Sequence, residues 1–146
     1  MLRALEENSE LIDILAAGTA MRFLTAYLGV TPGTRIISGT VRMHQRPIKV
    51  LVDALRQLGA DIKYVVNEGF PPLEITGTVL HGKSISLPGN VSSQYISALL
   101  MIGSVMPEGL TLHLTGEIIS RPYINLTLQL MKDFGAEATW TAENCI

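Results

Sequence analysis

The fold of this chain is decided by the stretch Ala16-Ala17-Gly18-Thr19-Ala20-Met21-Arg22, a small-residue turn that leads into the apolar segment 23–28. Gly18 can adopt backbone angles that other residues cannot, and it has no side chain that would block a ligand. Thr19 carries a hydroxyl suited to capping the helix that follows. The first N–H groups of that helix favour an anion. With Arg22 one turn further on, the stretch predicts either a simple helix cap or an anion-binding helix start.

A second copy of this pattern begins at the small polar turn Val91-Ser92-Ser93-Gln94. Other segments recur at an offset of 75 to 77 positions: Thr31-Pro32-Gly33 with Pro107-Glu108-Gly109, Arg46-Pro47 with Arg121-Pro122, and Leu58-Gly59-Ala60 with Phe134-Gly135-Ala136. Self-similarity at a fixed period is the signature of a repeated structural unit. We therefore expect an internal duplication, with repeat units at approximately residues 16–90 and 91–146. The recurrence favours anion binding over capping alone as the role of the first turn.

Each unit is expected to follow the order βαβαββ. A helix is predicted from Thr19 to Leu28, and another opens at Arg46-Pro47 and ends at Gly59, with helical spacing of Ile48, Leu51, Val52, Leu55 and Leu58. Short strands are predicted at 35–39, 61–65, 71–77, 83–87 and 110–116, and a short helix followed by a strand within 2–14. These elements predict an α/β fold of the α+β type, with helices packed against small mixed sheets.

The composition excludes several classes of protein. The chain has 146 residues, 47% of them hydrophobic, and a net charge of −2, which indicates a globular protein without the basic surface of a nucleic-acid binder. The single Cys145 excludes an internal disulfide framework and fits a reducing compartment. The apolar runs are too short for a membrane span, and no histidine has metal-ligand spacing. We expect a cytoplasmic protein that binds neither membrane, nucleic acid nor metal.

Four ordered motifs resemble the 3-phosphoshikimate 1-carboxyvinyltransferase family, also called EPSP synthase. The motifs are Ala17-Gly18-Thr19-Ala20-Met21-Arg22, Arg42-Met43-His44-Gln45-Arg46-Pro47-Ile48, Val91-Ser92-Ser93-Gln94-Tyr95 and Ser120-Arg121-Pro122-Tyr123-Ile124. The family fold has two lobes, each built from three βαβαββ units. The resemblance therefore implies that residues 1–146 form an incomplete N-terminal lobe of the enolpyruvyl transferase fold.

The resemblance also implies a reaction and a set of binding residues. Family members transfer the enolpyruvyl group of phosphoenolpyruvate to the 5-hydroxyl of shikimate 3-phosphate, through a tetrahedral intermediate that then loses phosphate. The resemblance implies that Arg42 binds phosphoenolpyruvate, with the Gly18-Thr19 turn beside it. The residues implied for shikimate 3-phosphate are Ser92, Ser93, Gln94, Ser120 and Tyr123, with Gln94 able to touch both substrates. Arg22 is included among the substrate-binding residues without assignment to either substrate. Arginine offers a planar charged fork for a phosphate, and a helix start favours an anion.

Several of these residues also have a purely structural interpretation. Arg46 and Arg121 precede proline at equivalent sites and are expected to brace the fold, and Arg22 could orient the turn without contacting a ligand. Tyr123 could be a core aromatic, and His44 is expected to be a solvated loop histidine. The family commonly has asparagine where this chain has Ala16, so Ala16 is given no role.

The resemblance places the catalytic acid and base outside this chain, together with the groups that hold the carboxylate of phosphoenolpyruvate. We expect no cofactor and no turnover by the isolated chain, which is expected to self-associate, whereas the full-length enzyme is expected to be a monomer. Two alternatives stay open. One is a fragment of UDP-N-acetylglucosamine 1-carboxyvinyltransferase, and the other is a non-catalytic module that binds a phosphorylated metabolite.

Overall fold

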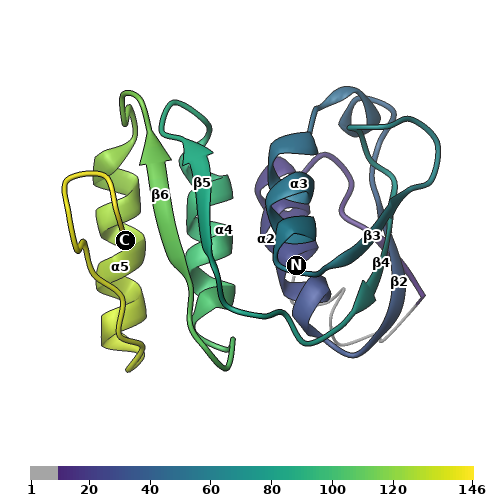
Figure 1. The fold of residues 1–146 in the computed structure, drawn as a ribbon. Helices are drawn as coiled ribbons and strands as arrows, with labels where there is room; N and C mark the ends of the chain where they lie inside the picture. The colour runs from purple at the N-terminus through teal and green to yellow at the C-terminus, as the bar shows by residue number, and fades with distance from the viewer. Residues whose placement is uncertain (1–9) are drawn as a thin grey trace. The chain divides into compact units, whose positions relative to one another are not determined.

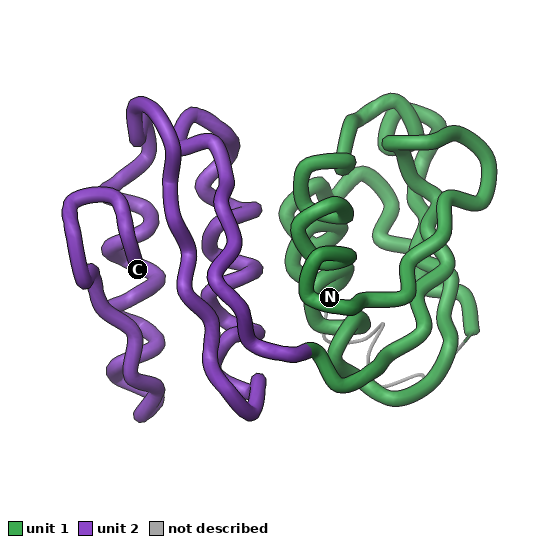
Figure 2. The backbone as a smooth tube through the Cα atoms, viewed as in Figure 1, with its two compact units in different colours: residues 1–80 green, residues 81–146 purple. Residues whose placement is uncertain are grey.

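The computed structural model describes residues 10–146. They form two compact units, which divide between Leu80 and His81 (Figure 2). The division lies at 80/81, about ten residues before the predicted start of the second repeat unit. The difference arises because the strand at 84–88 pairs with a strand of the second unit. A short helix followed by a strand was predicted within residues 2–14; residues 2–9 of this segment lie outside the described residues, and the strand is found at Leu11–Asp13.

The first unit is built on a four-stranded mixed sheet with the order β1-β2-β4-β3 (Figure 1). Its strands are β1 (Leu11–Asp13), β2 (Gly33–Ser38), β3 (Asp61–Tyr64) and β4 (Leu73–Gly77). β1 and β2 are parallel, and β4 is antiparallel to both β2 and β3. The parallel pair requires a crossover, which the helix between β1 and β2 supplies.

Two helices cover this sheet. Helix α2 (Gly18–Val30) lies against β2 and β4, and helix α3 (Lys49–Gln57) lies against β3 and α2. The five apolar positions predicted to share one face of the second helix are all buried: Ile48, Leu51, Val52, Leu55 and Leu58. The helical spacing in the sequence therefore identified the buried face of this segment correctly.

Helix α3 begins at Lys49, three residues after the predicted start at Arg46. Pro47 favours this later start, because the residue before a proline is disfavoured in the helical region, although Arg121 is helical before Pro122. Arg46 is accordingly extended, with φ −95° and ψ 117°. The N–H of Ile48 then donates to the carbonyl of Gly69 at 2.9 Å. Arg46 is thus left outside the helix, in the loop before it.

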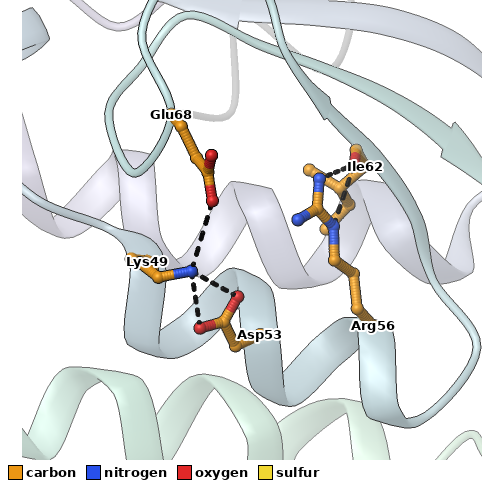
Figure 3. Close-up of polar contacts among 5 residues, drawn as sticks. All are labelled: Lys49, Asp53, Arg56, Ile62 and Glu68. Carbon is orange, nitrogen blue, oxygen red and sulfur yellow. Dashed lines mark hydrogen bonds and ion pairs between the residues drawn. The ribbon is translucent and has the colours of Figure 1, made fainter.

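Charged side chains fix both ends of α3 (Figure 3). Nζ of Lys49 lies 3.1 Å from Asp53 and 3.6 Å from Glu68, and the hydrogen bond to Asp53 is the main cause that raises the pKa of Lys49 above its ordinary value. At the other end, Nε and Nη2 of Arg56 donate to the carbonyl of Ile62 at 3.1 and 2.6 Å. These contacts connect the helix to the loop after β3 and to β3 itself.

The second unit repeats the same local arrangement. Strands β5 (Ser84–Pro88) and β6 (Thr111–Thr115) are parallel, and helices α4 (Ser93–Gly103) and α5 (Arg121–Asp133) pack against each other. Residues 144–146 run antiparallel to β6, with the N–H of Leu112 donating to the carbonyl of Ile146 at 2.8 Å. A parallel pair followed by an antiparallel neighbour is also the order of β1, β2 and β4.

Backbone geometry at equivalent positions supports the predicted duplication. Gly33 and Gly109 both have positive φ, at 109° and 69°, as do Gly59 and Gly135, at 100° and 85°. Only glycine adopts such angles readily, so each pair marks a turn of the same kind. None of the helices in the described part of the chain has the length and apolar character that crossing a membrane requires.

Candidate functional site

Each unit contains a pair of parallel strands, and the chain leads from the carboxyl end of each strand into a helix. In the first unit α2 follows β1, and the segment 39–48 follows β2; in the second, α4 follows β5 and α5 follows β6. Because the paired strands are parallel, their carboxyl ends meet at one edge of each sheet, where α/β proteins commonly bind ligands. All nine predicted binding residues belong to these connections or to the first five residues of these helices, four in the first unit and five in the second.

Helix α2 starts without a polar cap. Its N-cap is Ala17 and its first residue is Gly18, so Thr19 lies inside the helix and does not cap it, contrary to the prediction. The N–H of Ala17 is bound to the carbonyl of Ile14 at 3.1 Å. The first N–H groups of a helix have no partner within the helix, and no side chain at the N-cap reaches them here. Helix α2 therefore begins with donors that point toward the turn.

The turn before α2 is fixed to the segment after β2. Leu15 has a left-handed φ of 53°, which is unusual for a residue other than glycine. Its N–H donates to Oδ1 of Asp13 at 2.8 Å, and its carbonyl accepts from the N–H of Thr40 at 3.0 Å. A Cβ on Gly39 would lie 2.3 Å from the same carbonyl, so only glycine allows this approach. The two segments are therefore held side by side by backbone contacts.

Residues 40–46 form one wall of a cavity beside this turn. The segment contains the short 3₁₀ helix η1 (Met43–Gln45), which starts after Arg42. A cavity of about 400 Å³ is lined by Ala16, Thr40, Arg42, Met43 and Arg46. Met43 is buried beneath it, whereas both arginines are exposed. Among residues 10–146, the charged groups that line the cavity are the guanidinium groups of Arg42 and Arg46, and no carboxylate lines it.

Arg46 lies directly over the start of α2, a position that the sequence did not indicate. A Cβ on Gly18 would be 2.4 Å from Nη1 and 2.9 Å from Cζ of Arg46. The absence of a side chain at Gly18 is therefore what admits this guanidinium group. Arg42 lines the same cavity, and Thr19 is exposed on the first turn of α2, with half-buried Arg22 one turn along. The predicted phosphoenolpyruvate residues of the first unit thus cluster, with Arg46 added to them.

In the second unit, Ser92 is a true helix cap. It is the N-cap of α4, and its Oγ accepts from the N–H of Gln94 at 3.3 Å. Ser93 is the first residue of α4, and all three residues are half-buried. Ser92 occupies the position that Ala17 has in the first unit, so the two helix starts differ in their capping. The capping bond leaves the Ser92 hydroxyl proton available to a ligand.

Ser120 and Tyr123 lie at the start of the neighbouring helix. Ser120 is the N-cap of α5, and its side chain makes no capping bond. Tyr123 belongs to the first turn of α5 and is 66% exposed, so its interpretation as a core aromatic is wrong. Ser120 is half-buried, so Tyr123 is the more accessible of the two side chains.

A buried hydrogen bond joins the two helices that carry these residues. Oγ of Ser97 in α4 lies 2.7 Å from Oγ1 of Thr127 in α5, and Ser97 is only 5% exposed. Oγ1 of Thr127 in turn donates to the carbonyl of Tyr123 at 3.1 Å. Because that hydroxyl proton is used, Ser97 is the donor in the bond between the helices. The network fixes the first turn of α5 relative to α4.

Arg121, the equivalent of Arg46, braces the second unit as predicted. Its guanidinium group stacks on Trp140 with 4.1 Å between Cζ and the ring centroid, and Nη2 donates to the carbonyl of Glu143. Arg121, Glu117 and Glu143 also line a cavity of about 530 Å³. None of the predicted substrate residues lines that cavity, and its two carboxylates would repel a phosphate.

His44 is not the solvated loop histidine that the sequence predicted. It is half-buried in η1, and its Nε2 lies 2.9 Å from Oγ of Ser38. The contact connects the segment 40–46 to the end of β2. Among residues 10–146, no group of three or more side chains is arranged to hold a metal ion.

This arrangement of elements is found in solved EPSP synthases. A structure of EPSP synthase from Acinetobacter baumannii matches 94% of this chain and 29% of its own chain, with a TM-score of 0.79 and 25% sequence identity. The fold is therefore that of an enolpyruvyl transferase lobe, as the sequence predicted.

The sequence profile of the EPSP synthase family (3-phosphoshikimate 1-carboxyvinyltransferase) matches residues 2–145. The chain belongs to this family. It is 70% identical over 146 residues to 3-phosphoshikimate 1-carboxyvinyltransferase of Bacteroides fragilis strain YCH46, covering all of this chain and 36% of that protein. The protein of the same name in Shewanella halifaxensis is 50% identical over 121 residues, covering 83% of this chain and 28% of its own. The chain thus spans roughly a third of the length of these relatives.

Proposed function

We propose that this chain forms part of a 3-phosphoshikimate 1-carboxyvinyltransferase and supplies one side of its active site. In the proposed reaction, the 5-hydroxyl oxygen of shikimate 3-phosphate bonds to C2 of phosphoenolpyruvate, its proton passes to a base, and C3 gains a proton from an acid. Loss of a C3 proton and cleavage of the C2–O bond to phosphate then give the enol ether and inorganic phosphate. The acid and base of these steps are proposed to lie in the rest of the enzyme.

The observation that carries this proposal is the shared cavity of the first unit. Arg42 lines it, the start of α2 with Gly18 and Thr19 lies beside it, and no carboxylate of the described residues lines it. A guanidinium group and the backbone N–H groups at a helix start together suit the phosphate of phosphoenolpyruvate. Arg22 is assigned to the same group of residues, one helical turn away from the cavity.

Shikimate 3-phosphate is assigned to the second unit. Ser92, Ser93 and Gln94 at the start of α4 are proposed to bind it, together with Ser120 and Tyr123 at the start of α5. The parallel pairing of β5 and β6 supports this assignment, because it brings both helix starts to one edge of the sheet. Hydroxyl and amide groups at two helix starts can surround a phosphate without an arginine.

A chimeric enzyme tests the proposed function. This chain replaces the matching 146 residues of the Bacteroides fragilis relative, and phosphate release is followed with both substrates. We expect turnover by the chimera and none by the isolated chain, because half of the site alone can neither exclude water nor align the reactants. An inactive, folded chimera would refute the proposal, and UDP-N-acetylglucosamine serves as the control acceptor for the alternative transferase. Turnover by the isolated chain would show that it contains the whole catalytic machinery.

The isolated chain is also proposed to self-associate. Helix α5 and its C-cap expose a line of large apolar side chains, Leu126, Leu130 and Phe134, the last 90% exposed. In the complete enzyme the rest of the chain would cover this line, leaving a monomer in the cytoplasm, whereas an uncovered apolar patch favours association. The sedimentation coefficient of the isolated chain should therefore increase with protein concentration, and that of the chimera should not.

A further inference from the structure

We propose that Arg46 is a second anion-binding residue of the phosphoenolpyruvate site and holds the phosphate group together with Arg42 and the start of α2. The inference rests on the proposed function and adds a residue to it. Its first support is position, because Arg46 and Arg42 line the same cavity of about 400 Å³. The Arg46 guanidinium group also lies where a side chain on Gly18 would be, over the first residue of α2.

The second support is that this guanidinium group has no structural task. Among the residues that the structure describes, no hydrogen bond or ion pair engages the side chain of Arg46 or Arg42. Arg121, which also precedes a proline, is fully used, since it stacks on Trp140 and donates to the carbonyl of Glu143. The two equivalent arginines therefore differ in role: Arg121 braces its unit, and Arg46 faces a cavity.

The third support is the backbone that presents the side chain. Arg46 is extended and α3 begins only at Lys49, whereas Arg121, which also precedes a proline, is already the first residue of α5. Arg46 thus leaves the loop toward the start of α2 instead of continuing into a helix.

The chemistry of the substrate suits two guanidinium groups. The phosphate of phosphoenolpyruvate carries up to two negative charges, and two planar forks can bind its oxygens bidentately. Cleavage of the bond between C2 and the phosphate oxygen leaves the bonding electrons on the departing phosphate. A second guanidinium group at that position stabilises the added charge, so Arg46 is expected to affect phosphoenolpyruvate far more than shikimate 3-phosphate.

Titration of the 146-residue chain with inorganic phosphate tests the binding role directly. Amide chemical shifts of Gly18 and Thr19 report on the turn, and dispersed spectra show that each variant is folded. Losing a charge-assisted hydrogen bond should weaken phosphate binding about 10-fold or more in Arg46→Gln. Arg46→Lys should recover part of the affinity, because it keeps the charge without the fork. If Arg46→Gln does not fold, Arg46→Lys decides the question by binding more weakly than the wild type.

Lys63→Gln is the matched control for charge. Lys63 is an exposed cation of the same unit whose ion pair with Glu74, at 3.5 Å, lies on the sheet and not at the cavity. Its loss should change phosphate affinity by less than about twofold, because a distant surface charge is screened. Equal weakening by both variants would overturn the inference, as would wild-type affinity in Arg46→Gln. Absence of phosphate-induced shifts at Gly18 and Thr19 in the wild type would overturn it too.

Kinetics of the chimera separate this inference from the proposed function. In Arg46→Gln we expect the KM for phosphoenolpyruvate to rise about 10-fold, while that for shikimate 3-phosphate changes by less than about twofold. If the chimera is active and Arg46→Gln leaves its KM for phosphoenolpyruvate unchanged, the inference is overturned and the proposed function still stands. An inactive wild-type chimera would refute the proposed function, and the phosphate titration would still decide whether Arg46 binds anions.

Discussion

Replacing Gly18 with alanine should weaken anion binding while leaving the fold intact. The new Cβ would lie 2.4 Å from Nη1 of Arg46, and ordinary contact begins at 3.4 Å, so the guanidinium group must move by about 1 Å. Arg46 is exposed and flexible, so it can move without disturbing the core. Gly18 does not have a left-handed φ, and alanine has the higher helix propensity. The free energy of unfolding should therefore stay within about 0.5 kcal/mol of the wild-type value, or rise slightly.

The expected loss of binding follows from the displaced guanidinium group. A hydrogen bond to a charged group contributes about 1.5–3 kcal/mol, so full displacement would weaken phosphate binding about 10-fold to 100-fold. A shift of about 1 Å should give an effect near the lower end, because the charge stays in the cavity. Phosphate titration followed by amide shifts measures the affinity, and urea denaturation measures the stability of the same samples.

A double-mutant cycle with Arg46→Gln provides the control for this prediction. If the methyl group acts by displacing Arg46, Gly18→Ala should cost little affinity once the guanidinium group is gone. An equal loss in both backgrounds would contradict this reasoning and show that the methyl group blocks the backbone N–H groups themselves. A clear loss of stability would show instead that the start of α2 is more constrained than its geometry suggests.

Three further predictions concern stability. The hydroxyl of Tyr64 is buried without a hydrogen-bond partner, so Tyr64→Phe should raise the free energy of unfolding by about 1 kcal/mol, and a lowered urea midpoint would contradict this. Burial also raises the pKa of Tyr64 above 10.0, so the folded state keeps this proton to a higher pH than the unfolded state does. The free energy of unfolding should therefore decrease as the pH rises through 10, and it should decrease less in Tyr64→Phe. Ser97→Ala should lower the free energy of unfolding by about 1 kcal/mol, and by far less in a Thr127→Val background. Equal decreases in both backgrounds would mean that the two hydroxyl groups are not coupled. Arg121→Gln should lower the urea midpoint of the second unit without changing phosphate binding at Gly18, and unchanged stability would contradict the bracing role.

Local patterns in the sequence predicted those parts of the fold that depend on local physics. The spacing from Ile48 to Leu58 identified a buried helical face because burial follows helical periodicity. Gly59 and Gly135 marked helix ends because only glycine adopts their backbone angles readily. The same kind of reasoning failed at Thr19, where the helix begins two residues earlier than a threonine cap would require.

Contacts between distant segments could not be predicted in this way. The position of Arg46 over Gly18 depends on the pairing of β1 with β2 and on the bond between Leu15 and Thr40. No single segment encodes that contact, although two features were visible: a glycine at a helix start and an arginine directly before a proline. The boundary between the two compact units, at Leu80/His81, differs from the predicted repeat boundary near residue 90 for a similar reason. Strand β5 belongs to the second unit because it pairs with β6, and its own sequence does not indicate that partner.

The stacking of Arg121 on Trp140 gives the chain a built-in optical probe. Trp140 is the only tryptophan, and its indole Nε1 donates to Oδ1 of Asn125 at 2.7 Å. Its fluorescence therefore reports on the second unit alone, while far-ultraviolet circular dichroism reports on the helices of both units. Coincident transitions by the two signals would show that the units unfold as one cooperative body, and separated transitions would assign a stability to each.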